Sequence, residues 1–108
     1  MARYLVQASY TQQGLAGLIE NPENRTNAIS QLIEGAGGTL VSLDYAFGEF
    51  DIVVIGELPD HVSMAALSMA VAASGAVTNF RTTVLIPVAD VVEAARRAGS
   101  VGYRPPGS

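Results

Sequence analysis

The sequence predicts an α+β fold in which a four-stranded antiparallel sheet carries its helices on one face. The first observation is the run of consecutive β-branched residues Ile52–Ile55, which is typical of a strand with apolar contacts on both faces. The second is that segments with a helical apolar period lie on either side of this strand and its predecessor. The third is that Gly or Pro lies at most of the junctions between the later segments, such as Pro22, Gly37-Gly38, Gly48, Pro59 and Gly75. The resulting order β-α-β-β-α-β is the ferredoxin-like split arrangement, in which right-handed crossovers place both helices on one face.

The first half of the chain gives one strand and an interrupted helix. Residues 3–9 alternate loosely in polarity and predict the first strand. Thr11 is expected to cap a short helical turn through Leu18, and Asn21-Pro22-Glu23-Asn24 breaks this turn and restarts a helix. The restarted helix has an apolar stripe at i, i+3, i+4 and i+7: Ile29, Leu32, Ile33 and Ala36. Gly37-Gly38 ends it.

The second half gives three strands and two helices. Residues 39–46 and 51–57 are the expected strands of a hairpin that turns at 47–50, and a further strand is expected over 76–86. In the second strand, we expect Thr39, Val41, Leu43 and Tyr45 on one side and Leu40, Ser42, Asp44 and Ala46 on the other. Asp60 is expected to cap a slim, Ala-rich helix over 61–74, and Gly75 to end it. Asp90 and Glu93 are expected to form a capping-box-like pair for a short last helix that ends at about Arg97. We expect one domain over 1–99 and a flexible tail over 100–108.

The composition argues against several classes of function, including nucleic-acid binding and thiolate metal sites. The net charge is −4 and all six basic residues are Arg, clustered only at Arg96-Arg97, so no basic face for nucleic acid is expected. There is no Cys, and therefore neither a disulfide framework nor a thiolate metal site. No apolar run approaches the roughly 20 residues of a membrane span, and the N-terminus lacks the pattern of a secretory signal. We expect a cytoplasmic protein without a cofactor or a metal.

The sheet face opposite the helices predicts self-association. Alternation in the first strand gives Tyr4, Val6, Ala8 and Tyr10 to one face and Arg3, Leu5, Gln7 and Ser9 to the other. Because the strand at 52–55 is apolar on both sides, the second face is too apolar to be left to solvent. Two such sheets packed face to face, with a cavity between them, would cover it. We expect a homodimer or a higher homo-oligomer.

An ordered set of residues carries a family resemblance: Tyr10-Thr11, Gly14, Arg25, Gly37-Gly38, Gly48-Glu49-Phe50-Asp51, Glu57-Leu58-Pro59-Asp60 and Gly75. The chain resembles the GYD domain family, small bacterial and archaeal proteins named for a Gly-Tyr-Asp signature, which looks like a relative of the dimeric α+β barrel group. The resemblance supports the fold and implies no established biochemical function. Phe50 stands where the signature has Tyr, so a packing role for an aromatic ring is retained there, and a role for a phenol hydroxyl is not.

Two carboxylates and one histidine are candidates for chemistry. Asp51 and Glu57 lie about 20 Å apart on one strand and therefore cannot share a proton. Asp51 is expected to accept backbone N–H bonds around Gly48, and Glu57 to make a structural bond. His61 is the only histidine and follows the capping Asp60, so it is either an exposed first-turn residue or a general base or ligand.

Arg81 is the strand cation that packing explains least. It follows Phe80 among the polar residues Asn79, Thr82 and Thr83. One interpretation is an ion pair with Asp44, inside a dimer or at its rim. The other is an anion or carbonyl site in a cavity lined by Tyr10, Tyr45 and Phe47. Arg25, near a helix start, is expected to bind the carboxylate of Glu23 or of a loop.

Three functional interpretations follow. The first is a homo-oligomer that binds a small, mostly apolar molecule with one polar or anionic group, either as a binding module or as a cofactor-free enzyme acting through Tyr10, Asp44, Arg81 and His61. The second is a structural or assembly protein whose C-terminal tail docks on a partner. The third, a regulatory effector-binding module, is weaker because no DNA-binding segment accompanies the domain.

Overall fold

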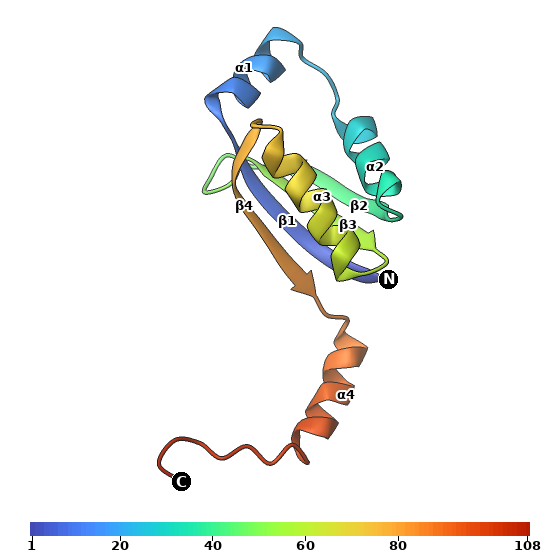
Figure 1. The fold of residues 1–108 in the computed structure, drawn as a ribbon, viewed down its shortest axis with the longest axis vertical. Coiled ribbons are helices and arrows are strands. Elements are labelled where there is room, and N and C mark those ends of the chain that lie inside the picture. Colours follow the sequence, from blue (N-terminus) through green and yellow to red (C-terminus); the bar gives the residue numbers. More distant parts are fainter.

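The computed structural model describes residues 1–108 and contains four strands and four helices (Figure 1). In chain order they are β1 Ala2–Tyr10, α1 Gln12–Glu20, α2 Thr26–Gly35, β2 Thr39–Tyr45, β3 Ile52–Leu58, α3 His61–Ala73, β4 Val77–Leu85 and α4 Val88–Ala98. The expected strands and helices are confirmed, with boundaries that differ by a few residues at most. None of the helices is long and apolar enough to cross a bilayer.

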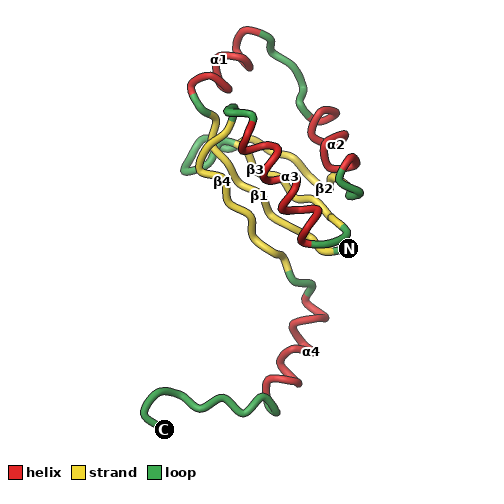
Figure 2. The backbone as a smooth tube through the Cα atoms, viewed as in Figure 1, coloured by secondary structure: helices red, strands yellow, loops and turns green.

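The four strands form one antiparallel sheet in the order β2-β3-β1-β4. β3 therefore lies between β1 and β2, and β1 lies between β3 and β4, so each helical crossover skips one strand. The α+β class and the four-stranded antiparallel sheet predicted from the sequence are confirmed. The first crossover contains two helices, α1 and α2, because the chain is interrupted at Asn21 (Figure 2).

The core lies between the sheet and the pair α2 and α3. Tyr4 and Ala8 of β1 are 4% and 2% exposed, and Leu58 of β3 is 2% exposed. They form one apolar cluster with the other buried side chains of this layer: Ile33, Ile52, Val54, Met64 and Leu67. The helices thus cover the face that carries Tyr4, Val6, Ala8 and Tyr10, as the alternation of β1 predicts.

The opposite face, which we call the uncovered face, has no helix packed over its centre. It carries Arg3, Leu5, Gln7 and Ser9 of β1, Val53, Ile55 and Glu57 of β3, Thr39, Ser42 and Asp44 of β2, and Arg81, Thr83 and Leu85 of β4. Val53 and Ile55 are half-buried, whereas their neighbours Ile52 and Val54 are buried. β3 therefore carries apolar side chains on both faces of the sheet, as its run of β-branched residues predicts.

Two bulges change which side chains share a face. In β2, Leu40 pairs with Gly56 and Ser42 with Ile55, so Val41 is an extra residue. The strict alternation expected for this strand is therefore wrong: Leu40 lies on the same side as Leu43 and Tyr45, against the helices. In β4, an extra residue falls between Thr78 and Arg81, where Asn79 has φ 52°. Asn tolerates this left-handed conformation better than most residues.

The ends of α1 and α3 follow the sequence signals. Thr11 accepts a hydrogen bond from the Gly14 N–H at 3.0 Å, and Asp60 accepts one from the Ser63 N–H at 2.7 Å. Gly75, with φ 78°, follows the C-cap of α3. Each of these ends was predicted from the residue type.

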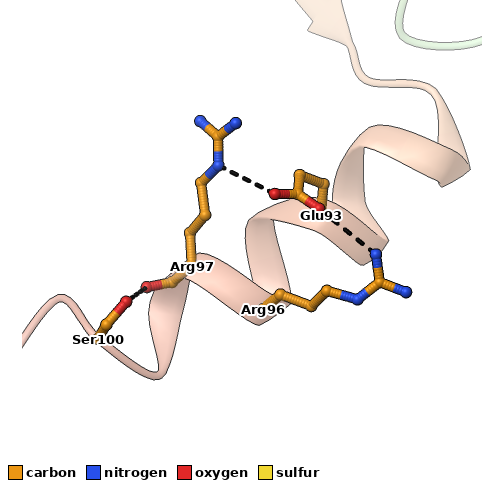
Figure 3. Close-up of polar contacts among 4 residues, drawn as sticks. All are labelled: Glu93, Arg96, Arg97 and Ser100. Atoms are coloured by element: carbon orange, nitrogen blue, oxygen red, sulfur yellow. Dashed lines mark hydrogen bonds and ion pairs between the residues drawn. The ribbon is translucent and has the colours of Figure 1, made fainter.

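The expected cap of α4 is wrong. The helix begins at Val88, directly after Pro87, and no side chain caps it. Glu93 instead pairs along the helix with Arg96 at 3.4 Å and with Arg97 at 3.2 Å (Figure 3). Pro87 fixes the start two residues before Asp90, so the pair Asp90 and Glu93 lies inside the helix instead of at its N-terminus.

α4 and the tail extend away from the sheet (Figure 1). The radius of gyration is 17.5 Å, against about 13 Å for a compact domain of this length. Val88, Val91 and Val92 on α4 are 82%, 50% and 48% exposed. An amphipathic helix whose apolar side has no cover within its own chain is the most unusual feature of the fold.

Candidate functional site

An apolar cleft of about 310 Å³ lies between α2 and α3, above β1 and β3. Hydrophobic side chains make up 17 of its 20 lining residues. The sheet contributes Tyr4, Val6, Ala8, Ile52 and Val54, α2 contributes Ile29, Leu32 and Ile33, and α3 contributes Met64, Leu67 and Val71. The volume is at the lower end of small-molecule sites, and such sites are mostly apolar with a few polar groups.

The polar groups of the cleft are the hydroxyls of Tyr4, Tyr10 and Ser74 and the guanidinium of Arg25. The Tyr10 and Tyr45 hydroxyls lie 3.3 Å apart and share a hydrogen bond. Burial, and then the bond to Tyr45, raise the pKa of the Tyr10 phenol well above its ordinary value, while the charge of Arg25 lowers this pKa. Tyr10 is therefore a neutral hydrogen-bonding group at physiological pH. Arg25 pairs with Glu23 at 2.7 Å, as expected, and supplies the one positive charge among the lining residues.

The candidate residues lie on different sides of the sheet. Tyr10 and Tyr45 are on the helix side, with ring centroids 6.3 Å apart. Asp44 and Arg81 are on the uncovered face, at the two ends of the row Asp44–Val53–Gln7–Arg81. Three inter-strand spacings separate their backbones by about 14 Å, so these two residues form no ion pair within one chain.

Arg81 contacts an aromatic ring instead. Its guanidinium carbon lies 5.2 Å from the centroid of the Phe50 ring, which is a cation–π geometry. Phe50 is 7% exposed and stands apart from the helix-side cluster. The aromatic packing role that the resemblance leaves to position 50 is filled by this contact.

The carboxylates at the ends of β3 hold strands together. The Tyr10 N–H donates to Asp51 Oδ2 at 2.8 Å, so Asp51 accepts a backbone bond from β1, not from the amides around Gly48 as expected. The Asp51 N–H in turn donates to the Ala8 carbonyl at 2.9 Å. Glu57 makes the structural bond predicted for it, a 3.5 Å ion pair with Arg3.

His61 and Phe47 are both away from the cleft. His61 is exposed at the first position of α3, and Phe47 is 94% exposed in the turn between β2 and β3. The hydrogen bond from the Ser63 N–H lowers the pKa of the Asp60 carboxyl, so this cap is ionised at neutral pH. No group of three or more His, Asp or Glu side chains is placed to hold a metal ion.

The cleft on the helix side is the site that sequence reasoning missed. The sequence predicts a pocket at the other face of the sheet or between subunits instead. The available signals were the small residues of α3, such as Ala70, and the break at Asn21, since together they leave space between the two helices. Neither signal fixes the distance between α2 and α3, which depends on tertiary packing.

These features define a class: a small antiparallel α+β protein with one face of its sheet covered by helices and the other exposed. The comparisons with known proteins identify it further. The chain belongs to the GYD domain family, whose model matches residues 4–95. Over 93 residues it is 32% identical to a protein of Thermus thermophilus named glutamine synthetase and cystathionine beta-lyase binding protein. That similarity covers 85% of this chain and 96% of the Thermus protein.

Proposed function

We propose that this chain is a cytoplasmic, self-associating binding protein whose partners are other proteins, metabolic enzymes in particular. The observation that carries the proposal is α4. Its Val88, Val91 and Val92 form an exposed apolar stripe on a helix that extends from the domain. Amphipathic helices of this kind bind by laying their apolar side into a groove of the partner. The name of the Thermus protein, which describes binding to two enzymes, points to the class of partner.

Self-association belongs to the same proposal. The exposed surface is 7380 Å², against about 5,700 Å² for a compact monomer of 11.2 kDa. α4 and the tail are exposed along their whole length, and on the uncovered face Leu5, Val53 and Ile55 are only half-buried. We expect the full chain to sediment as a dimer or a larger species at micromolar concentration. A single species of 11.2 kDa would contradict this part.

Binding to an enzyme can be tested with a pair of variants in one helix. Val92→Glu places a charge on the apolar stripe, whereas Ala94→Glu places the same charge toward the polar side of α4. The purified chain would be mixed with glutamine synthetase and with cystathionine β-lyase from its own host, and complexes measured by surface plasmon resonance. We expect Val92→Glu to weaken binding at least tenfold and Ala94→Glu to leave it nearly unchanged. No binding by the unaltered chain, or equal binding by both variants, would reject the proposed role of α4.

A second candidate function rests on the cleft. Its apolar lining and the single cation Arg25 suit a molecule with a hydrocarbon part and one anionic group. Native mass spectrometry of protein purified from its own host is the direct measurement, and we expect a co-purifying molecule of this chemistry. Arg25→Gln should reduce its occupancy, whereas Arg104→Gln in the tail should not. If neither Arg25→Gln nor Arg104→Gln co-purifies with a ligand, the cleft is not the binding site of such a molecule.

A further inference from the structure

A second hollow, of about 300 Å³, borders the apolar cleft where β1 ends. The two cavities share Tyr10, Arg25 and Ala76 as lining residues. The hollow differs from the cleft in its chemistry, because only 3 of its 9 lining residues are hydrophobic. Besides the two shared polar residues, its polar side chains are Gln13, Asn21 and Glu23. An apolar compartment and a polar one therefore meet at Arg25.

The charges at this junction differ from those of a simple anion site. Arg25 and Glu23 are joined at 2.7 Å, and their side chains are 39% and 47% exposed, so both remain accessible to a ligand. Asp51 lies beside the same junction, since its carboxylate accepts the Tyr10 N–H at 2.8 Å. Two carboxylates against one guanidinium leave an excess of negative charge, which disfavours a ligand that is only an anion. A ligand with both an ammonium and a carboxylate has no net charge and matches both signs of the ion pair.

We propose that the cleft and the hollow together bind a free α-amino acid with an apolar side chain. The inference rests on the ligand binding proposed above for the cleft, and it specifies the class of ligand. The carboxylate of the amino acid accepts from the Arg25 guanidinium, which has further N–H donors beside the one that bonds to Glu23. The ammonium donates to the Glu23 carboxylate, and the side chain extends into the cleft.

The cleft determines which amino acids are suitable. Its volume is about 310 Å³, whereas an apolar cavity of about 150 Å³ is large enough to hold benzene. A branched, thioether or aromatic side chain therefore fits. A charged side chain would exchange water for a lining in which 17 of 20 residues are hydrophobic, and this exchange is costly. We expect leucine, methionine and phenylalanine to bind, and aspartate and lysine to bind much more weakly.

Three related molecules test the two charged groups of the ligand separately. L-leucine carries both groups, L-leucinamide lacks the carboxylate, and 4-methylpentanoate lacks the ammonium. We expect isothermal titration calorimetry on the full chain to show that L-leucine binds at least tenfold more tightly than either analogue, because each analogue leaves one charged side chain without its ligand group.

The analogues also distinguish this inference from the function on which it rests. If 4-methylpentanoate binds as tightly as L-leucine, the amino-acid class is wrong while binding of an anionic molecule in the cleft stands. If L-leucinamide binds as tightly, the carboxylate is not recognised and both fail. If none of the three binds, the inference fails, and the native mass spectrum decides separately whether the cleft holds another molecule.

Three single variants locate the binding. Glu23→Gln removes the charged acceptor of the ammonium, so it should weaken L-leucine at least tenfold and leave 4-methylpentanoate no weaker. Arg25→Gln should weaken both molecules. Glu34→Gln makes the first change on the exposed side of α2, away from both cavities, and should bind L-leucine as the unaltered protein does. Far-UV circular dichroism verifies that each variant is folded. Binding of L-leucine by Glu23→Gln as tight as by Glu34→Gln would overturn the inference.

Discussion

The guanidinium of Arg81 lies over the ring of Phe50, 5.2 Å from its centroid, and this contact connects edge strand β4 to the turn that precedes β3. The ring is 7% exposed although it belongs to the face of the sheet without helices. Phe50, which stands at the Tyr position of the family signature, is therefore a packing residue in this chain, and its ring contacts the charged side chain of Arg81.

Two substitutions at Phe50 distinguish the contribution of the aromatic ring to stability from the effect of the Tyr hydroxyl found in the family signature. We expect Phe50→Ala to lower the free energy of unfolding by about 3 kcal/mol, because a buried ring is removed and a void is left. Phe50→Tyr keeps the ring and its contact with Arg81, so it should change this free energy by less than about 1 kcal/mol. Urea unfolding measures both. A loss with Phe50→Tyr as large as that with Phe50→Ala would show that the site excludes a hydroxyl.

Asp51 should be a structural anchor. Its carboxylate accepts the Tyr10 N–H at 2.8 Å beyond the last β1–β3 pair, and Asp51→Ala leaves this amide without that acceptor. We expect a loss of about 1.5–3 kcal/mol in the free energy of unfolding, the range for bonds to charged groups. Glu49→Ala, two residues earlier with no side-chain bond, is the control and should be nearly neutral. Equal effects of the two substitutions would argue against the anchor.

Two glycines of α1 provide a matched test of close packing. A Cβ at Gly14 would collide with the backbone carbonyl of Ala76, whereas a Cβ at Gly17 would meet nothing within 4 Å. Gly17→Ala should therefore stabilise the protein by about 0.5–1 kcal/mol through helix propensity. Gly14→Ala should destabilise it, because the collision is with backbone that cannot move aside locally. Thermal unfolding followed by circular dichroism gives both signs, and stabilisation by Gly14→Ala would contradict the observed contact of α1 with the α3–β4 turn.

Local signals made most of the elements predictable. The β-branched residues of β3, the N-caps Thr11 and Asp60, and Gly75 each act within a few residues of themselves, so their effect can be read from sequence. The bulge at Val41 could not be read, because it depends on how β2 aligns with β3. It reversed the side expected for Leu40. Asn79, a residue that tolerates positive φ, is the single local hint of the second bulge.

The candidate site was less predictable, since it depends on which side chains face each other. The sequence pattern groups Tyr10 and Tyr45 with Arg81 in one cavity, yet in the structure the sheet lies between the two Tyr residues and Arg81. The ion pair of Arg25 with Glu23 was predictable because only two residues separate the partners. The ring partner of Arg81 was not, since Phe50 is 31 positions away and reaches Arg81 through the fold of the turn.

The ionisation of Tyr10 should make stability depend on pH in the alkaline range. Burial and Tyr45 raise the pKa of this phenol in the folded state above the value of about 10 in an unfolded chain. The folded state therefore holds its proton more tightly. The resulting stabilisation is complete below about pH 10 and is lost as the pH rises through the higher pKa of the folded state.

Urea unfolding between pH 8 and 12 measures this dependence for the unaltered protein and for two variants. Tyr10→Phe should reduce the alkaline loss of stability, because the titrating group is gone. Tyr103→Phe, in the exposed tail, should retain it. The same alkaline profile in all three proteins would mean that Tyr10 is not the group responsible.

The tail should be dispensable for folding. All of residues 100–108 are exposed, and the Arg104 side chain donates to the Ser108 carbonyl at 2.9 Å, which lies within the tail itself. We expect truncation after Gly99 to lower the thermal midpoint by less than about 5 °C, the change that corresponds to about 1 kcal/mol in a domain of this size. A larger decrease would mean that the tail packs on the folded domain.

The attachment of α1 has a consequence for how the molecule fluctuates. The Thr11 N–H donates to the Ala76 carbonyl at 3.0 Å, and no side chain of Gln12–Glu20 is buried, so the helix is fixed mainly at its first turn. A segment held in this way opens at a much lower free energy than the sheet does. Its amide hydrogens should exchange with deuterium while those of β1 and β3 remain protected. Residues of α1 also line the hollow beside Arg25, so this wall of the hollow belongs to a segment that we expect to open more readily than the sheet beneath it.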